Sequence, residues 1–456
     1  MNLHRKLLQR ESLGQPLRIG VIGAGKFGSM YLAQARRTPG IHLVGLVDLS
    51  VPRAREVLAN TGWAPERYAA ESLDHAVRTG GTYVGDDPDD MISHPAIDII
   101  VEVTGNPLAA VRHILKAFTA KKHVINVTVE ADAFCGPLLA RKAVEAGVIY
   151  SLAYGDQPAL ICDLVDWART AGFAVVSAGR GHKWLPHFAA STPDTVWDHY
   201  GLTEEQARLG GLNPRMFNSF LDGSKPSIES AAVCNATGLA PPPNGLEYPP
   251  SSLTSIPSVC RPKSEGGQLH CKGQVEVLSS LERDGRQIPD NLRWGVFVVF
   301  EGDSEYVRRC FGEYGMITDP SGRYGALYKR WHMIGLELGI SVAAVGLRGE
   351  PTGCATAFRA DAVATAKRDL RSGEILDGEG GYTVVGKLMP AETSLAIGAF
   401  PLGLAHQVKV LKPVKHGMPL LWEDVEFDPT LEAVRVRREM EAVFARPAEA
   451  VTQKLD

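Results

Sequence analysis

The chain has 456 residues, of which 45% are hydrophobic and 22% charged, with a formal net charge of −4. This length predicts two to three domains, and the composition is typical of a water-soluble globular protein. The small negative charge argues against nucleic acid or an anionic membrane as a partner. No apolar run approaches the roughly 20 residues that span a bilayer. Seven cysteines without a CxxC pair predict free thiols and a cytoplasmic protein.

The N-terminal part predicts a basic arm and then a nucleotide-binding turn. Residues 1–16 are expected to form the arm, and the apolar run Leu17–Ile22 a buried parallel strand. The following G-x-G-x-x-G spacing assigns Gly23 to a tight turn and Gly25 to the place where a pyrophosphate approaches the backbone. Gly28 is expected where a helix packs on the strand.

The residues after the glycines predict the rest of a dinucleotide site. The helix that begins KFGSM would direct the amides of Lys26 and Phe27 at the phosphates. A second strand leads to Asp48, where a carboxylate would meet the adenosine ribose hydroxyls and favour NAD(H). Arg53 follows closely and can offset the repulsion of the 2′-phosphate of NADP(H). The sequence therefore allows either NAD(H) or NADP(H) as the cofactor.

Further strands are expected over residues 97–103, 123–129 and 147–158, with helices between them. This alternation predicts a doubly wound parallel sheet, a Rossmann domain, over residues 17–155. Cofactors of such sheets lie at the carboxyl ends of the strands. The residues that follow the strand over 97–103 are therefore expected to border the cofactor: Thr104, Gly105 and Asn106.

Several stretches carry a family resemblance. "VIGAGKFGS", "DIIVEVTGNP" and "KKHVINVTVE" resemble the nucleotide-binding half of homoserine dehydrogenases, and "AKRDLRSGEILDGEGG" and "KHGMPLLWEDVE" resemble a SAF-type domain. The chain resembles homoserine-dehydrogenase-like oxidoreductases with a C-terminal SAF domain, a family that includes 1-deoxy-D-xylulose 5-phosphate reductoisomerase-like enzymes. One departure disfavours homoserine as substrate: Val129-Glu130 stands where homoserine dehydrogenases have an Asn-Lys pair.

This resemblance implies an α/β chain with a small β-rich C-terminal domain and a homodimeric assembly. The central α+β domain would hold catalysis and dimerisation, and its predicted elements include a helix over 158–170, a strand over 174–181 and one long helix over 324–347. The expected parts are the arm (1–16), the Rossmann domain (17–155), the catalytic domain (156–360), the SAF-like domain (361–430) and a helix with a tail (431–456).

Two polar clusters are candidates for chemistry. The first, "SAGRGHKWLPHF", places Lys183 just after a predicted strand, where it could neutralise an anionic substrate or simply be solvated. The second, "FNSFLDGSKPSIE", contains Asn218, Asp222, Lys225 and Glu229 around the start of an amphipathic helix from Pro226, which Ser224 would cap.

Lys225 at that helix start is a plausible clamp for an anion, and Asp222 and Glu229 suit acid–base chemistry or a divalent metal. The competing interpretation is a capped surface helix with solvated charges. His332, on the predicted long helix, is a weaker catalytic candidate.

The resemblance implies reductoisomerisation of 1-deoxy-D-xylulose 5-phosphate to 2-C-methyl-D-erythritol 4-phosphate, an isoprenoid precursor, with NADP(H) and Mg²⁺ or Mn²⁺. The expected partner is thus a small phosphorylated or acidic substrate. Two alternatives remain. The chain could be a dehydrogenase of another hydroxy acid or sugar derivative, or a non-catalytic nucleotide sensor whose SAF-like domain binds a partner.

Overall fold

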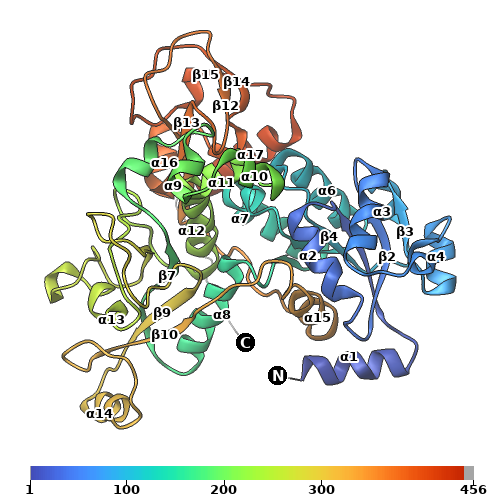
Figure 1. Ribbon diagram of the computed structural model, residues 1–456, viewed down its shortest axis with the longest axis horizontal. Coiled ribbons are helices and arrows are strands. Elements are labelled where there is room, and N and C mark those ends of the chain that lie inside the picture. Colours follow the sequence, from blue (N-terminus) through green and yellow to red (C-terminus); the bar gives the residue numbers. More distant parts are fainter. Residues whose placement is uncertain (1, 446–456) are drawn as a thin grey trace.

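The structure is a computed structural model that describes residues 2–445 (Figure 1). Figure 1 shows a first sheet with its helices in blue and cyan, a second sheet in green to gold, and a module in orange and red. The helix α12 (Ser224–Thr237) lies between them and contacts all three parts. Among the residues that the structure describes, no helix is long and apolar enough to cross a bilayer.

The first sheet has the order β3-β2-β1-β4-β5-β6, and all its strands are parallel. The strands progress outward from β1 in both directions, so a crevice opens at the carboxyl ends of β1 and β4. This arrangement confirms the predicted doubly wound sheet. Its strands are β1 Leu17–Ile22, β2 Ile41–Val47, β3 Tyr83–Gly85, β4 Ile99–Glu102, β5 His123–Asn126 and β6 Tyr150–Leu152.

Both faces of this sheet are covered. Ile99 and Val101 of β4 point into one hydrophobic core and Ile100 into another, as the alternation of a strand requires. Most of residues 1–16, the expected arm, forms the helix α1. The helices of this part are α1 Leu3–Ser12, α2 Lys26–Ala35, α3 Val51–Asn60, α4 Leu73–Thr79, α5 Pro88–Ser93, α6 Pro107–Thr119 and α7 Val129–Ala146.

Three strands are shorter than the sequence predicts, and β6 spans only Tyr150–Leu152 instead of residues 147–158. β4 ends at Glu102 instead of residue 103, and β5 ends at Asn126 instead of residue 129. Because α7 begins at Val129, Glu130 lies in the first turn of a helix. An acidic residue is favourable there, since the helix dipole presents its positive end.

The second sheet has the order β10-β9-β7-β8, with β7 parallel to β8 and antiparallel to β9. α8 (Gln157–Thr170) leads into β7 and packs against it, which confirms the helix and strand predicted there. The strands are β7 Ala174–His182, β8 Gln274–Ser279, β9 Val296–Glu301 and β10 Tyr324–Lys329. The helices around them are α9 Val196–Tyr200, α10 Glu204–Leu209, α11 Pro214–Leu221, α13 Ile256–Val259 and α14 Glu305–Glu313.

The single long helix predicted over 324–347 is wrong. Its first part forms β10, which pairs antiparallel with β9, and only Gly339–Arg348 is helical, as α15. Gly335 has a φ of +72°, and a Cβ there would lie 2.6 Å from a carbonyl oxygen in the first turn of α2. The loop that carries His332 therefore lies against α2, and α15 packs beside α1 and the first sheet.

α12 is buried along nearly its whole length, so it is not the predicted amphipathic helix. Gly223, with a φ of +93°, stands at its N-cap, and the Ser224 hydroxyl instead accepts a hydrogen bond from the Gly386 amide at 2.8 Å. Ala231 and Ala232 are fully buried, and their small side chains allow neighbouring elements to approach closely.

Residues 360–426, here called the C-terminal module, form two small sheets and α16 (Ala391–Ile397). α17 (Glu432–Phe444) confirms the predicted charged helix, and its buried Arg437 binds the buried Asp361 at 2.6 and 3.0 Å. Residues 446–456 of the predicted tail lie outside the described residues. The strands are β11 Ala360–Ala366, β12 Ile375–Asp377, β13 Val384–Pro390, β14 His406–Val410 and β15 Val425–Glu426.

Candidate active site

The glycine-rich turn after β1 has the geometry that a pyrophosphate requires. Gly23 has a φ of +111°, and a Cβ there would lie 2.7 Å from the carbonyl oxygen of Val103. Gly25, the N-cap of α2, has no atom within 4 Å of its Cβ position, whereas a Cβ on Gly28 would lie 2.7 Å from the Gly23 carbonyl oxygen. The predicted turn, open backbone and close packing are all present.

The amino end of α2 is accessible at this turn. Lys26 is exposed and Phe27 is half-buried, so the unpaired N–H groups of the first turn can meet an anion. These residues, together with the space over Gly25, fit the diphosphate of a nicotinamide dinucleotide.

Asp48 is the residue predicted to bind the ribose, and both of its carboxylate oxygens accept hydrogen bonds. Oδ2 accepts the Ala24 amide at 2.8 Å and Oδ1 the Ser50 amide at 2.9 Å. Arg53 Nη2 lies 2.6 and 2.8 Å from the same oxygens. Burial acts to raise the pKa of Asp48, but the hydrogen bonds from Arg53 and the amides hold it below its ordinary value. The Arg53 side chain is 57% exposed, so it presents a cation beside the turn.

A buried polar network shapes the turn after β4. Glu102 accepts hydrogen bonds from the hydroxyls of Thr104 at 2.6 Å and Thr128 at 2.5 Å. The Gly105 amide donates to the Thr128 hydroxyl at 3.0 Å. The Asn106 side chain caps α6, accepting an N–H of its first turn at 3.1 Å. This turn therefore offers a cofactor its exposed backbone rather than the Asn106 amide.

α12 packs against α7, which begins just past the carboxyl end of β5, and against α8, which leads into β7. Arg180 on β7 and Glu229 on α12 are both buried and form an ion pair. The predicted acid–base residue Glu229 is thus held by a guanidinium. Removing one member of such a pair leaves the other charge unpaired in a medium of low dielectric constant.

Lys225 links α12 to α7, the helix that follows β5. Its Nζ forms an ion pair with Glu130 in the first turn of α7. Glu130 is the departure from the homoserine-dehydrogenase pattern, and Lys225 brings a cation to that position from α12. Burial acts to lower the pKa of Lys225, but surrounding carboxylates raise it above its ordinary value. These carboxylates belong to Glu130, Glu379, Glu229 and Asp156.

Three of these carboxylates, those of Glu130, Asp156 and Glu379, were not among the predicted site residues. Asp156 caps α8 by accepting the Gln157 amide at 3.0 Å, and burial with the nearby Glu229 raises the pKa of Asp156 to about 7. Burial and Glu130 raise the pKa of Glu379, in the C-terminal module, to about 8. The Asp-Gln-Pro pattern signals only a helix start, and nothing local in the sequence brings Glu379 to Lys225.

Two predicted catalytic residues form hydrogen bonds with other parts of the protein. Asn218 donates to the carbonyl oxygens of Ser191 at 3.1 Å and Gly380 at 3.0 Å, and accepts from the Ser191 hydroxyl at 2.7 Å. Asp222 accepts an amide of α12 at 2.8 Å and the Nζ of the buried Lys367 at 2.7 Å. Both side chains are thus engaged with protein partners, and their catalytic role stays a prediction.

The predicted metal site at Asp222 and Glu229 is not formed. Each carboxylate is paired with a cation, Lys367 and Arg180 respectively. Within residues 2–445, no group of three or more histidine, cysteine, aspartate or glutamate side chains is arranged to hold a metal ion. An ammonium group, that of Lys225, lies among the site's carboxylates. This donor set does not fit Mg²⁺ or Mn²⁺.

A second cationic group lies where β7 ends. Lys183 Nζ donates to the carbonyl oxygen of His199 at 2.6 Å, and burial together with the nearby Arg293 lowers the pKa of Lys183. Burial also lowers the pKa of Arg293. In the described part of the chain, neither cation forms an ion pair with a carboxylate. Arg293 was missed because it lies in a loop distant in sequence and belongs to no motif.

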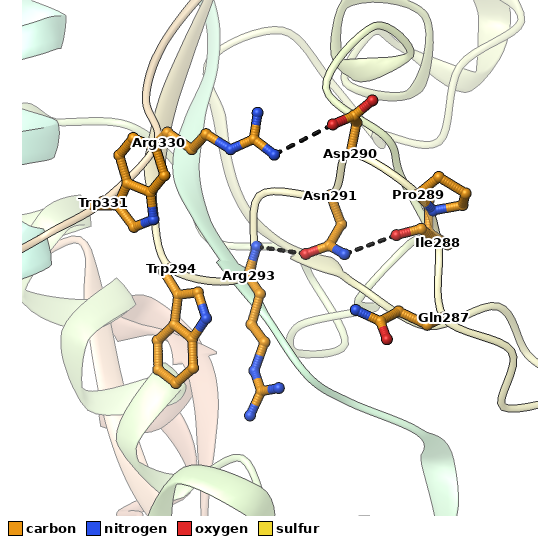
Figure 2. Close-up of a pocket in the computed structure, with 9 residues that line it drawn as sticks. All are labelled: Gln287, Ile288, Pro289, Asp290, Asn291, Arg293, Trp294, Arg330 and Trp331. Atoms are coloured by element: carbon orange, nitrogen blue, oxygen red, sulfur yellow. Dashed lines mark hydrogen bonds and ion pairs between the residues drawn. The ribbon is translucent and has the colours of Figure 1, made fainter.

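A cavity of about 530 Å³ lies beside Arg293, and Figure 2 shows the residues that line it. Arg330 and Asp290 form an ion pair at 3.2 Å on one side of it, and the Arg293 guanidinium points away from that pair. The ring of Trp294 lies 4.5 Å from the guanidinium. The lining residues are Gln287, Ile288, Pro289, Asp290, Asn291, Arg293, Trp294, Arg330 and Trp331.

His332 adjoins this cavity instead of facing the pocket from a helix. Its Nδ1 lies 2.7 Å from the carbonyl oxygen of Trp294, so Nδ1 carries the proton and Nε2 is the acceptor. Burial and the charge of Arg180 lower the pKa of His332, which keeps the ring neutral. The structure thus supports a neutral histidine at the border of the site.

Two protein-family models match parts of the chain. Residues 17–126 match the model described as "Oxidoreductase family, NAD-binding Rossmann fold", and residues 155–338 match "Oxidoreductase DRL, catalytic domain". No curated protein sequence matches the chain significantly. The second match covers α8 to β10 and so includes Lys183, Lys225 and Arg293.

Solved structures show distant likeness. A DOX-P reductoisomerase in complex with magnesium is 16% identical (TM-score 0.33), and the alignment covers 49% of this chain and 58% of that one. The chain thus matches little more than half the length of this reductoisomerase. A homoserine dehydrogenase from Thiobacillus denitrificans is 15% identical (TM-score 0.41), covering 72% and 74%. A probable dehydrogenase from Thermotoga maritima is 15% identical (TM-score 0.37), covering 74% and 90%.

At these TM-scores the neighbours carry no argument about activity, so the assignment rests on the two family matches and on the geometry of the turn. Residues 17–126 thus match the NAD-binding Rossmann fold of the GFO/IDH/MocA oxidoreductase family, and residues 155–338 match the catalytic domain of the DRL oxidoreductases.

Proposed function

We propose that this oxidoreductase uses NADPH to reduce a small phosphorylated sugar, and that its substrate is 1-deoxy-D-xylulose 5-phosphate. The observation that carries the proposal is the pair Lys183 and Arg293, two half-buried cations that no described carboxylate neutralises. Leaving such charges uncompensated is costly, and a dianionic phosphate would compensate both. A substrate with a single carboxylate would balance only one of them.

The preference for NADPH is proposed from Asp48 and Arg53. A free aspartate would repel the 2′-phosphate of NADP(H), but here Arg53 binds both carboxylate oxygens and remains 57% exposed. This guanidinium can therefore bind the 2′-phosphate while it neutralises Asp48.

The chain's own groups suit the chemistry of this reaction. The carbon skeleton of the substrate rearranges to an aldehyde, which accepts a hydride and a proton to give 2-C-methyl-D-erythritol 4-phosphate. The bound cofactor supplies the hydride. The Lys225 ammonium can donate a hydrogen bond to the carbonyl oxygen and stabilise negative charge on it. Asp156, whose pKa is raised to about 7, can supply the proton to that oxygen.

The test follows the absorbance of the reduced cofactor with purified protein, NADPH or NADH, and a panel of substrates. The panel contains 1-deoxy-D-xylulose 5-phosphate, aspartate semialdehyde and short 2-keto acids, each with Mg²⁺, with Mn²⁺ and with a chelator. We expect NADPH to be consumed with 1-deoxy-D-xylulose 5-phosphate, with one equivalent of the branched alcohol phosphate found by NMR. Turnover only with another compound would indicate a different dehydrogenase, and cofactor binding without any turnover would indicate a sensor.

A pair of variants tests the phosphate site itself. Arg293→Met should raise the KM for the phosphorylated substrate at least tenfold, because it removes one charge-assisted contact. Arg330→Met is the matched control, since Arg330 lines the same cavity but is already paired with Asp290. Equal KM values for the two variants would contradict the assignment.

A further inference from the structure

A loop of the C-terminal module reaches the site. The loop over 377–381 is held on α11: Arg215 Nη1 donates to the Asp377 carbonyl oxygen at 2.7 Å, and Asn218 Nδ2 donates to that of Gly380 at 3.0 Å. A Cβ on Gly380 would lie 2.1 Å from the Arg215 carbonyl oxygen, so only glycine allows this approach.

A buried lysine fixes the same loop from within the module. Lys367 Nζ donates to the Gly381 carbonyl oxygen at 2.8 Å, to the Ser191 carbonyl oxygen at 2.7 Å and to Asp222 Oδ2 at 2.7 Å. With its three donors used, this ammonium ties the loop to the end of α11. The loop therefore has a set position relative to the catalytic domain.

Glu379, at the middle of this loop, is partly buried among groups from three other elements. Glu130 faces it from α7 and Lys225 from α12, while Ser219 and Asp222 face it from α11. The Rossmann domain, the catalytic domain and the C-terminal module thus meet at one ammonium group.

We propose that the C-terminal module completes the active site through Glu379, a positioning residue that sets the charge around Lys225. When Glu379 is protonated, it adds no charge beside the pair of Lys225 and Glu130. When it is ionised, a second carboxylate competes for the ammonium and repels an anionic substrate. The effect on substrate rests on the proposed function; the place of Glu379 does not.

The pKa of Glu379 lies in a pH range where activity and stability can be measured. Burial and the charge of Glu130 raise its pKa from 4.5 to about 8, against the opposing effect of Lys225. The folded protein therefore keeps a proton here that the unfolded chain releases above about pH 4.5. Stability from this group is fully present below that pH and is lost as the pH rises toward 8.

The first measurement is thermal unfolding of the full chain at pH 5 and pH 9. Glu379→Gln keeps the shape of the protonated side chain, so the variant should melt higher than the wild type at pH 9 and at the same temperature at pH 5. Glu392→Gln, at an exposed position of the same module, should match the wild type at both values. An equal shift at both pH values, or none, would overturn the proposal.

The second measurement is kcat/KM for 1-deoxy-D-xylulose 5-phosphate between pH 6.5 and 9.5. The wild type and Glu392→Gln should lose activity at least fivefold above about pH 8, while Glu379→Gln should lose markedly less. Asp156 titrates in all three proteins, so its effect cancels in the comparison. If kcat/KM of Glu379→Gln fell above pH 8 as much as that of the wild type, the proposal would be overturned. Absent turnover in the wild type would instead refute the proposed function, and the melting result would still decide the role of Glu379.

Discussion

The glycine-rich turn and the Lys225 junction, which we propose as the cofactor half and the substrate half of the site, are built differently. The turn is made by a continuous stretch, Gly23–Gly28, whose backbone conformation provides the open space. The junction is made by single side chains from distant elements, with Lys225 paired to a residue 95 positions away in the chain. A local motif therefore identifies the cofactor half, whereas the substrate half exists only once the parts are assembled.

Gly25→Val should have the largest effect on the glycine-rich turn, because it should prevent the cofactor from binding there. The branched side chain would occupy the space where the diphosphate must lie, and we expect NADPH affinity to fall about a hundredfold or more. Because no atom lies within 4 Å of this position, the melting temperature should change little. Fluorescence titration with NADPH measures the loss, and Gly312→Val, at an equally open position in α14, is the control. Unchanged affinity in Gly25→Val would remove the diphosphate from this turn.

The junction should be broken next by Glu229→Gln, which leaves the buried Arg180 unpaired. We expect a loss of about 3–5 kcal/mol in the free energy of unfolding, measured by urea denaturation. The double change of Arg180→Met with Glu229→Leu should recover much of it, since both charges are then gone. Glu439→Gln, at an exposed ion pair, serves as the control. A normal stability for Glu229→Gln would mean that this ion pair is not buried.

Lys225→Met separates the two halves by function. It should lower turnover about a hundredfold and raise the substrate KM, because it removes both an electrostatic contact and ground-state binding. NADPH affinity should stay normal, since the turn is untouched. Steady-state kinetics beside Lys412→Met, an exposed lysine in an ion pair, gives the comparison. Near-normal turnover would move the chemistry away from α12.

The smallest effect is expected at Arg53. Arg53→Ala should weaken NADPH binding about tenfold relative to NADH, because it removes the cation beside Asp48 and frees that carboxylate for the ribose. Arg55→Ala is a matched control on the same helix, where Arg55 instead donates to the Tyr68 carbonyl oxygen at 3.2 Å. Equal ratios of the two affinities in wild type and Arg53→Ala would place the 2′-phosphate elsewhere.

The fold of the first sheet could be predicted because its signals are local. β1 spans Leu17–Ile22 as expected, and its glycines have the predicted geometry. The failure over 324–347 has a non-local cause: β10 is a strand because it pairs with β9, and Gly335 adopts a positive φ against α2. The assignment of the C-terminal module to the SAF type stays a prediction.

The candidate site could be predicted only in part, because many of its contacts join residues that are distant in sequence. Lys225 was singled out from its neighbours in sequence, but its partners Glu130 and Glu379 come from other parts of the fold. Asp222 lies in the same sequence cluster, but its hydrogen bond from Lys367, 145 positions away, could not be predicted from its neighbours. A cluster of polar residues in a sequence does not reveal which side chains would bind a substrate and which stabilise the fold, since both tasks use the same residue types.

The central claim is that Lys225 and Glu130 act as one unit across the junction of the two domains, and a double-mutant cycle tests it most directly. The kcat/KM for 1-deoxy-D-xylulose 5-phosphate would be compared among the wild type, Lys225→Met, Glu130→Gln and the protein with both changes. We predict that the double variant is no less active than Lys225→Met alone, because Glu130 acts through the ammonium that is already gone. Losses that multiply in the double variant would contradict the account.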